Sequence, residues 1–379
     1  MLKKRYLMTP GPTPVPEDIM LEMARPIIHH RTAQFKEIIK SCEEGLKYVL
    51  GTQNDVVIFT SSGTGAMEAA VANFLSAKDK AICVIGGKFG ERWSEICKAY
   101  GVEFINLKVT WGKAVDPTDI KNALEKNKNV KAVFTTQCET STGALNDIQA
   151  IGKIVSKSGA ILVVDAISSL GACEFKTDEW KVDVVVGGSQ KGLMIPPGLS
   201  FCSVSEKAKK MIATSSLPKY YFDIKKALKS LEKNDTPYTP AVTLMIGLAK
   251  ALNMIKEEGI EEVIKRHRRL ANAVRQAMKA LGLELLSASP ADSVTAVEVP
   301  EGIDGEALVK SIKENRGVWF AGGQAQLKGK IFRIATLGFM GDFDVIISIS
   351  ALELALKEAG YEFRVGSGVS AALNVLEVD

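Results

Sequence analysis

Apolar runs rich in β-branched residues recur through roughly the first half of the chain, and helix-length segments of mixed polarity separate them. Such runs are typical of strands that are buried on both faces of a parallel sheet. We expect strands at 56–60, 81–85, 102–107, 130–135, 160–164, 182–186 and 199–204, and helices at 65–75, 91–100, 117–127 and 147–158. This alternation predicts an α/β fold in which helices wrap a mostly parallel sheet.

The pattern changes after about residue 240, where long helical patterns at 240–259 and 260–281 are followed by short strands and helices. Prolines alternate with Gly, Thr and Val from Pro10 to Pro16, which favours an extended segment and forbids a helix there. No element is predicted for the tail from Gly366 to Asp379. The predicted parts are an extended N-terminal arm (1–20), a large domain (21–258) and a small C-terminal α+β domain (259–379).

Composition narrows the class of protein. Hydrophobic residues make up 46% and charged residues 24% of the 379 residues, as in folded globular proteins. The net charge of +4 is too small and too evenly spread to indicate a nucleic-acid partner. No apolar run approaches the ~20 residues that span a bilayer, and the first residues lack the apolar segment of a secretory signal. We therefore expect a cytoplasmic protein with no membrane partner.

Cysteine and histidine usage argues against a metal site. The six cysteines are far apart in sequence and none forms a C-x-x-C pair, so zinc-ribbon, iron–sulfur and thioredoxin-like sites lack their usual signature. Only three histidines are present, which argues against a zinc ion on three histidine ligands. We expect no metal, and we expect the cysteines to be reduced core residues.

Small residues from Ser61 to Glu68 follow a predicted strand and open a predicted helix. Small side chains let backbone N–H groups and hydroxyls close on an anion at the positive end of the helix dipole. The segment is not a Walker loop, and Glu68 takes the place of the last Gly of G-x-G-x-x-G. By itself it is equally typical of a plain strand–helix turn. The better match at Gly366–Ala371 has too little chain after it to form a βαβ unit.

Two ionisable residues follow predicted strands. Asp165 directly follows the strand at 160–164, where ligands of open α/β sheets bind, although a helix N-cap is its plainer interpretation. Lys191 lies among glycines and small polar residues after the strand at 182–186. An amine held in a ligand crevice can form a Schiff base with a carbonyl. Together the two residues suggest the pair that a pyridoxal phosphate site requires, an amine for the aldehyde and an anion for the pyridinium nitrogen.

A series of motifs is similar to the class V aminotransferase family, and its closest branch is the alanine–glyoxylate and serine–pyruvate (serine–glyoxylate) aminotransferases. The motifs run in family order over roughly residues 5–360. The resemblance implies the fold of type I pyridoxal phosphate enzymes, with a mostly parallel central sheet and a smaller C-terminal α+β domain. The motifs are T-P-G-P-T-P-V-P from Thr9, H-R-T from His30, S-S-G-T-G-A-M-E-A-A from Ser61, E-T-S-T-G from Glu139, V-V-D-A-I-S-S-L-G from Val163, G-S-Q-K-G-L from Gly188, T-P-Y-T-P from Thr236 and F-R-I from Phe332.

Carried over residue by residue, the resemblance implies pyridoxal 5'-phosphate as the cofactor and a set of residues that contact it. Lys191 would be the Schiff-base lysine, and Asp165 would pair with the pyridine nitrogen. Thr64 and Gly65 would lie at the phosphate group with the start of the helix behind them. Gln190 would help to hold the same phosphate.

Four further positions match residues around the cofactor ring and the substrate. Phe89 matches the aromatic residue that stacks on the ring, often Trp or Tyr in relatives, although a plain core Phe is the alternative. Thr140 matches a hydroxyl residue near the ring oxygen. Arg333 matches the arginine that grips the substrate carboxylate, and Gly11 would lie at the substrate pocket.

Thr239 matches a residue that reaches the phosphate from the partner subunit, which implies a homodimer with shared active sites. Thr236 and Tyr238 are close by, and the sequence does not choose among the three. Arg31 is a candidate second arginine for an acidic substrate, but it belongs more naturally to the structural H-R-T element.

The resemblance implies an aminotransferase that moves the amino group of alanine or serine to glyoxylate or pyruvate in two half-reactions. A donor such as aspartate or aminoethylphosphonate, a lyase reaction and a non-enzymatic role on the same scaffold stay open as alternatives. A cysteine desulfurase is disfavoured, because that reaction needs a cysteine near the substrate arginine and every cysteine precedes residue 203. The amino donor cannot be identified from the sequence.

Overall fold

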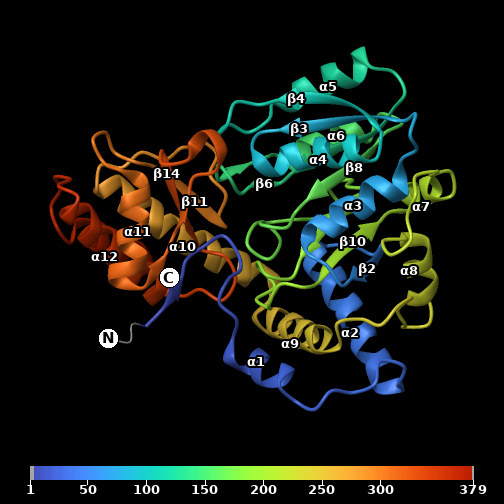
Figure 1. Cartoon of the computed structure of the whole chain (residues 1–379), viewed down its shortest axis with the longest axis horizontal. Coiled ribbons are helices and arrows are strands. Elements are labelled where there is room, and N and C mark those ends of the chain that lie inside the picture. The colour runs from blue at the N-terminus through green and yellow to red at the C-terminus, as the bar shows by residue number, and fades with distance from the viewer. Residues whose placement is uncertain (1–3, 378–379) are drawn as a thin grey trace.

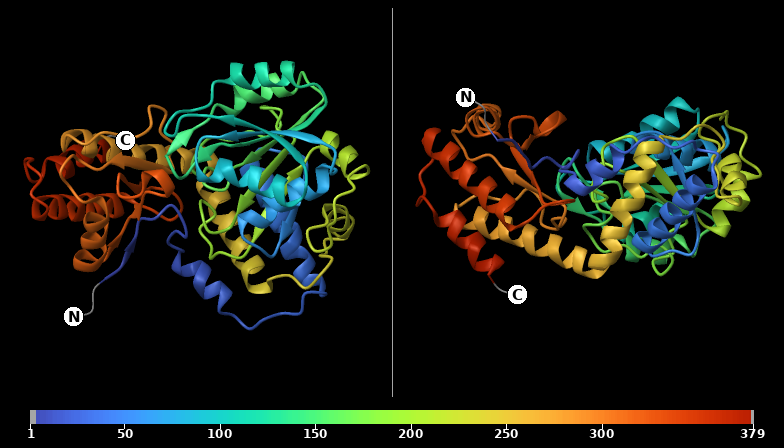
Figure 2. Two further views of the ribbon diagram at one scale, coloured as in Figure 1. Left: turned by 45° about the horizontal axis from the view of Figure 1, so that its top comes forward. Right: turned by 90° about the horizontal axis from the view of Figure 1, so that it is seen from below.

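The computed structural model describes residues 4–377. Residues 1–3 and 378–379, at the ends of the predicted arm and C-terminal domain, lie outside the described residues. Figure 1 shows a larger part built around one sheet and a smaller part that carries most of the C-terminal elements. The long helix α10 (Ile260–Ala280) runs from the larger part into the smaller one, as both views of Figure 2 show.

The larger part contains a seven-stranded sheet of order β2-β10-β9-β8-β5-β3-β4. All neighbours pair in parallel except β10, which runs antiparallel to both β2 and β9. The segment that joins β9 to β10 is short and holds no helix, so it cannot make the crossover that a parallel pair requires. The strands are β2 (Asp55–Phe59), β3 (Lys80–Ile85), β4 (Glu103–Lys108), β5 (Val130–Thr136), β8 (Ile161–Asp165), β9 (Val184–Gly188) and β10 (Ser200–Val204). The prediction of an α/β fold with a mostly parallel sheet is confirmed.

Helices cover both faces of this sheet. Successive strand residues point to opposite faces, and accordingly Leu162 packs in one apolar cluster and Val163 in another. Leu46 belongs to the first cluster and Val71 to the second. The helices of the larger part are α1 (Glu17–Met23), α2 (Ala33–Leu50), α3 (Gly63–Phe74), α4 (Lys88–Ala99), α5 (Pro117–Lys126), α6 (Ile148–Val155), α7 (Glu206–Ile212), α8 (Ile224–Leu231) and α9 (Val242–Glu258).

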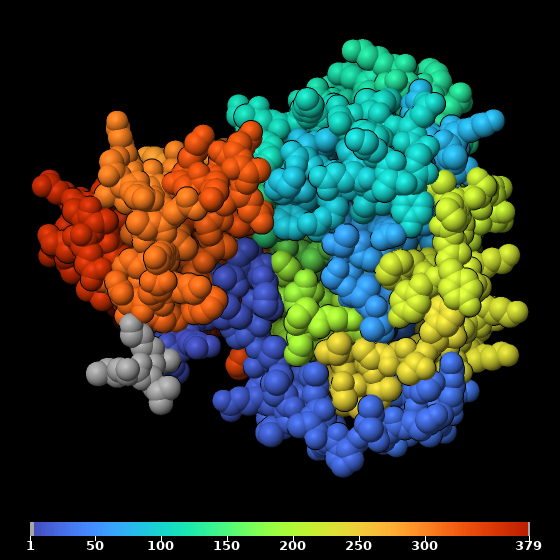
Figure 3. Space-filling model, in the orientation of Figure 1, coloured from blue at the N-terminus to red at the C-terminus, as the bar shows by residue number. Residues whose placement is uncertain are grey.

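The N-terminal segment connects the two parts of the molecule. Strand β1 (Tyr6–Leu7) pairs in parallel with β12 (Val318–Trp319) in the smaller part. The chain then continues to the larger part, where the Thr13 amide donates to the Gln190 carbonyl at 3.3 Å. Figure 3 shows this segment in blue between the orange and green surfaces. Helix α1 begins at Glu17, so the extended stretch ends within the arm predicted over 1–20.

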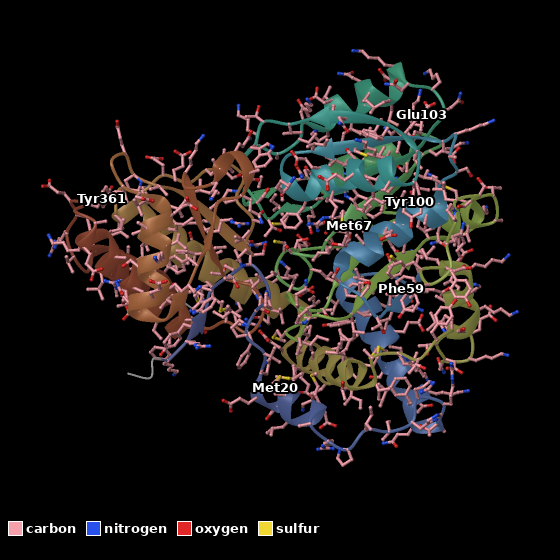
Figure 4. All side chains as sticks on the ribbon, in the orientation of Figure 1. Met20, Phe59, Met67, Tyr100, Glu103 and Tyr361 are labelled. Atoms are coloured by element: carbon pink, nitrogen blue, oxygen red, sulfur yellow. The ribbon has the colours of Figure 1, made fainter. Side chains whose placement is uncertain are left out.

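The smaller part has a three-stranded antiparallel sheet of order β11-β14-β13. Tyr361, labelled in Figure 4, lies in this part, and its hydroxyl donates to the Leu281 carbonyl at 3.1 Å. A short hairpin of β6 (Cys138–Glu139) and β7 (Ala144–Leu145) projects from the larger part. The elements of the smaller part are β11 (Val294–Glu298), α11 (Gly305–Arg316), β12, β13 (Ala321–Gly322), the 3-10 helix η1 (Ala325–Leu327), β14 (Ile331–Ala335), α12 (Asp342–Glu358) and α13 (Ser367–Leu376).

The tail is helical, although the sequence pattern assigns no element to it. Helix α13 packs along α10, because the apolar side chains of Ala372 and Leu376 join the cluster that contains Leu270 and Met278. Among residues 4–377, no helix has the length and apolar character needed to cross a membrane.

Candidate active site

Asp165 and Lys191 lie at the carboxyl ends of two neighbouring strands. Asp165 is the last residue of β8, opposite Val186 of β9, and Lys191 follows β9 by three residues. Only 4% of Asp165 and 8% of Lys191 is exposed to solvent. The Lys191 ammonium donates a hydrogen bond to the Pro10 carbonyl of the N-terminal segment. The structure therefore brings together the two ionisable residues that the sequence singles out.

Burial shifts the pKa of both groups toward neutrality. It raises the pKa of Asp165 to about 7, while the amide of Ile167, donating at 2.8 Å, acts in the opposite direction. It lowers the pKa of Lys191 to about 8, against the favourable charge of Asp165. Groups with such shifted pKa values in a buried crevice are typical of proton-transfer sites.

The N-terminal segment closes over Lys191 at Gly11. Gly11 has a φ of +117°, and a Cβ atom there would lie 2.5 Å from Cδ, Cε and Nζ of Lys191. The positive φ disfavours any residue with a Cβ atom, and such an atom would also displace the lysine amine. The Thr13 hydroxyl also donates to the Lys191 carbonyl at 3.0 Å. The N-terminal segment thus holds both the side chain and the backbone of the lysine.

A cradle of small residues lies at the start of α3. No side chain caps this helix, so the N–H groups of Gly63 and Thr64 are available to a bound anion, whereas the Gly65 amide donates to the Ser62 carbonyl at 2.8 Å. A Cβ atom at Gly65 would lie 2.8 Å from Cζ of Phe222, and one at Gly188 would lie 3.2 Å from Oε1 of Gln190. That buried Gln190 oxygen has no hydrogen-bond partner among the described residues. The small residues and the uncapped start of the helix fit a phosphate group, to which the NH2 of the Gln190 amide can donate.

Phe89 and Thr64 are linked by Arg92, which the sequence does not single out. Phe89 lies half-buried in the first turn of α4. The guanidinium carbon of Arg92, one turn later, lies 4.9 Å from the centre of the Phe89 ring. Its Nη1 donates to Oγ1 of Thr64 at 3.1 Å. Arg92 adds positive charge beside the α3 cradle, and its only signal in the sequence is its place one helical turn after Phe89.

Arg333 reaches the site from β14 in the smaller part. It is 4% exposed, and burial lowers its pKa to about 10. Its Nε and Nη2 donate to the Gly322 carbonyl at 3.2 and 2.7 Å, and its Nη1 donates to the Thr140 carbonyl at 2.9 Å. One N–H on each terminal nitrogen is left, which is the pair that a carboxylate takes in a bidentate contact.

Thr140 and Glu139 connect this arginine to the large sheet. The Thr140 hydroxyl donates to Oγ of Ser168 at 2.7 Å. Glu139 is 1% exposed and accepts the amide of Gly90 at 2.9 Å. Sequence reasoning gives Glu139 no role, although a glutamate amid small polar residues in a buried hairpin is an available signal.

Thr239 lies away from these groups within one chain. It is exposed and lies on the loop before α9. At the end of this loop, the Ala241 amide donates to the Thr60 hydroxyl at 3.1 Å. The Thr236 hydroxyl donates to the Tyr238 carbonyl at 2.7 Å. Arg31 donates to the Thr236 carbonyl at 2.8 Å and pairs with Asp235, so it holds this loop. Among the described residues, no contact joins the loop to Lys191 of the same chain.

The cysteines are buried, and the possible metal ligands are scattered over the described residues. All six cysteines are buried and unpaired by disulfides, and burial raises the pKa of Cys42, Cys138 and Cys202 far above the ordinary thiol value. Across the part of the chain that the structure describes, no three His, Cys, Asp or Glu side chains are grouped to hold a metal ion.

Comparison with known proteins places this arrangement in a family. The sequence profile of the family "Aminotransferase class-V" matches residues 5–336. Relatives include the "Soluble hydrogenase, small subunit" of a Synechococcus species, 47% identical and covering 99% of both chains. The L-aspartate–glyoxylate aminotransferase of Paracoccus denitrificans is 38% identical over 98% of this chain and 96% of its own. The serine–glyoxylate aminotransferase of Methylorubrum extorquens is 36% identical over 98% of this chain and 96% of its own.

The fold agrees with these matches. The crystal structure of ureidoglycine–glyoxylate aminotransferase from Bacillus subtilis superposes with a TM-score of 0.93 at 31% identity, covering 100% of this chain and 99% of that one. The chain belongs to the class V aminotransferase family and is a pyridoxal phosphate-dependent transaminase.

Proposed function

We propose that this transaminase moves the amino group of alanine or serine to a 2-oxo acid such as glyoxylate or pyruvate. The names of three relatives combine different donors, aspartate, serine and ureidoglycine, with the same acceptor, glyoxylate. The observation that carries the proposal is buried Lys191, which lies under the N-terminal segment and close enough to Asp165 and Arg333 for their charges to act on it. The acceptor glyoxylate is common to all three names, whereas the donor differs among them.

In this proposal Lys191 would hold the cofactor covalently, and Asp165 would be the anion beside the pyridine nitrogen. Thr64, Gly65 and Gln190 provide the cradle that fits the phosphate. The half-buried Phe89 ring would supply the stacking face, and Thr140 would lie near the ring oxygen. When bound, pyridoxal phosphate supplies an electron sink for the bonds at the substrate Cα.

The protein residues then bind the substrate and move its protons. Arg333 binds the substrate carboxylate through the N–H on each terminal nitrogen that its backbone contacts leave free. This contact fixes the orientation of the Cα–H bond. Lys191, with a pKa that burial lowers to about 8, takes the proton from Cα as a general base. Gly11 leaves room for the lysine, because a Cβ atom there would lie 2.5 Å from its Nζ, and in this proposal it lies at the substrate pocket.

A homodimer completes each site in this proposal. Thr239, with Thr236 and Tyr238 on the same loop, reaches the phosphate of the partner subunit. The loop is exposed or half-buried and makes no contact with Lys191 of its own chain, which leaves it free to serve another copy. We assign the protein to the cytoplasm on the sequence grounds given above.

Aspartate is the second candidate donor, because the Arg92 guanidinium can bind the side-chain carboxylate of such a substrate. This guanidinium makes one hydrogen bond, to Thr64, and pairs with no carboxylate among the described residues. It can therefore meet a second carboxylate. Half-reactions with Ala, Ser, Asp, Glu and aminoethylphosphonate, followed by the loss of the visible absorption of the lysine-bound cofactor, rank the donors. Fastest loss with Ala or Ser supports the proposal, and fastest loss with Asp replaces it.

Lys191→Ala tests the assignment of the site. The wild-type protein is expected to absorb visible light after incubation with pyridoxal phosphate and, after borohydride reduction, to carry the cofactor on Lys191 by mass spectrometry. The variant is expected to lose both signals and transamination while staying folded. Lys78→Ala, which changes an exposed lysine, is the matched control and is expected to behave as wild type. Retained turnover in Lys191→Ala would rule the assignment out.

A further inference from the structure

The Glu139 carboxylate is buried within the site and has no part in the function proposed above. Its Oε2 accepts the Gly90 amide at 2.9 Å, and its Oε1 accepts the Phe89 amide at 3.3 Å and the Ser141 hydroxyl at 2.5 Å. The Ser141 oxygen in turn accepts the Lys88 amide at 3.1 Å. The first three N–H groups of α4 therefore end on the Glu139–Ser141 pair.

This pair replaces the cap that α4 lacks. The residue before the helix is Gly87, which has no side chain to accept a hydrogen bond. A Cβ atom at Gly87 would lie 2.6 Å from Cδ of Glu139 and would also collide with the Ser141 hydroxyl. Glycine is needed there because Glu139 occupies the space. A buried carboxylate at this end also interacts favourably with the helix dipole.

The same turn of chain holds the arginine of the site. Thr140, between the two capping residues, accepts the Nη1 donor of Arg333 at 2.9 Å. The negative charge of Glu139 also raises the pKa of Arg333, against the effect of burial. A single turn thus contacts Phe89, at the start of α4, and Arg333, on β14 of the smaller part.

We propose that Glu139 is a positioning residue that fixes the Phe89 ring relative to Arg333, and thereby the cofactor ring relative to the substrate carboxylate. The inference rests on the proposed function, because it uses the stacking role of Phe89. Glu139 contacts neither cofactor nor substrate in this account. It acts through the first turn of α4.

Glu139→Gln is the test. Glutamine keeps the shape and one acceptor oxygen, but its NH2 group then opposes a backbone N–H of α4. The opposed N–H groups push the first turn of α4, and with it Phe89, away from its position. Because a misplaced ring loses part of its contact with the cofactor, we expect the dissociation constant of pyridoxal phosphate to rise roughly tenfold. We also expect an altered visible circular dichroism band, which reports the orientation of the bound ring, and at saturating cofactor a lower kcat with little change in KM.

Glu353→Gln is the matched control. Glu353 is 3% exposed and accepts the amides of Gly366 and Val369, at 2.5 and 3.1 Å, at the start of α13. It is the same kind of buried cap, in a helix that no contact of the site involves. We expect Glu353→Gln to lower thermal stability and leave cofactor affinity and the visible dichroism band unchanged.

The outcomes separate this inference from the proposed function. If Glu139→Gln binds pyridoxal phosphate within about twofold of wild type with the same dichroism band, Glu139 is only a structural cap and the inference is wrong. If wild type itself takes no cofactor on Lys191, the proposed function fails first. If Glu139→Gln does not fold, Ser141→Ala removes the hydroxyl alone and is expected to weaken cofactor binding in the same direction; unchanged binding there overturns the inference.

Discussion

Burial controls the reactivity of Lys191 at the scale of single residues. The amine must be neutral to attack an aldehyde, and its pKa is lowered to about 8. We therefore predict that the rate at which cofactor-free protein captures pyridoxal phosphate rises with pH, with a midpoint of about 8, and then levels off. The measurement is the amount of borohydride-trapped adduct on Lys191 after short incubations.

A variant of Asp165 provides the control for this experiment. Its negative charge favours the protonated form of Lys191, and so it holds the pKa of the lysine above the value that burial alone would give. Asp165→Asn is thus expected to move the midpoint to lower pH. A midpoint at the ordinary lysine value in the wild-type protein would show that Lys191 is not desolvated.

Residues that follow a strong local pattern could be predicted from the sequence, and residues whose role depends on distant contacts could not. Asp165 ends one apolar strand and Lys191 follows another by three residues, which places both at the ligand edge of the sheet. The approach of Gly11 to Lys191 joins positions 180 residues apart. The capping of α4 by Glu139 likewise depends on the β6–β7 hairpin folding over the helix start.

At the scale of elements, the strands of the large sheet follow from their apolar runs, whereas some ends depend on packing. Helix α3 begins at Gly63, before the predicted start at residue 65, although glycine disfavours helix. A Cβ atom at Gly63 would meet the side chain of Ile167, so close contact between elements decides the residue. The antiparallel direction of β10 likewise depends on the short connection between β9 and β10. The apolar pattern of a strand does not indicate its direction.

Helix α13 has the apolar spacing of a helix at Val369, Ala372, Leu373 and Leu376, but the short segment gives a weak signal alone. Its stability comes from packing against α10. We predict that Leu376→Ala, which changes a side chain 9% exposed, lowers the free energy of unfolding by about 2 kcal/mol. Leu373→Ala, at a side chain 40% exposed, is the control and is expected to have a much smaller effect.

Chemical denaturation followed by circular dichroism measures both variants of α13. The cofactor adduct on Lys191 is expected to form normally in each folded variant, because α13 makes no contact with the site residues. Equal stability losses in Leu376→Ala and Leu373→Ala would contradict the packing that the structure shows.

At the scale of the whole molecule, the candidate site lies where three parts of the chain meet. The N-terminal segment supplies Gly11, the larger part supplies Lys191 and Asp165, and the smaller part supplies Arg333. Figure 3 shows the N-terminal segment lying between the other two parts. Any motion of the smaller part therefore moves Arg333 relative to Lys191.

The loop with Thr239 lies beside exposed aromatic side chains. Tyr220 is 73% and Tyr221 is 41% exposed, and both stack on Tyr238, with ring centres 5.8 and 5.3 Å apart. Exposed aromatic residues gathered on one surface are typical of interfaces. This surface is consistent with the proposal that the loop serves the site of a second copy.

Mixing two defective variants tests whether the sites are shared. One chain carries Lys191→Ala and the other carries Thr236→Ala with Thr239→Ala, each nearly inactive at limiting cofactor. If each site combines Lys191 of one subunit with the loop of its partner, a hybrid dimer has one site with both defects and one site with neither. After unfolding and co-refolding of equal amounts, half of the dimers are hybrids, so about a quarter of all sites recover. If each subunit uses its own loop, every hybrid site keeps one defect and no activity returns, which would contradict the shared site.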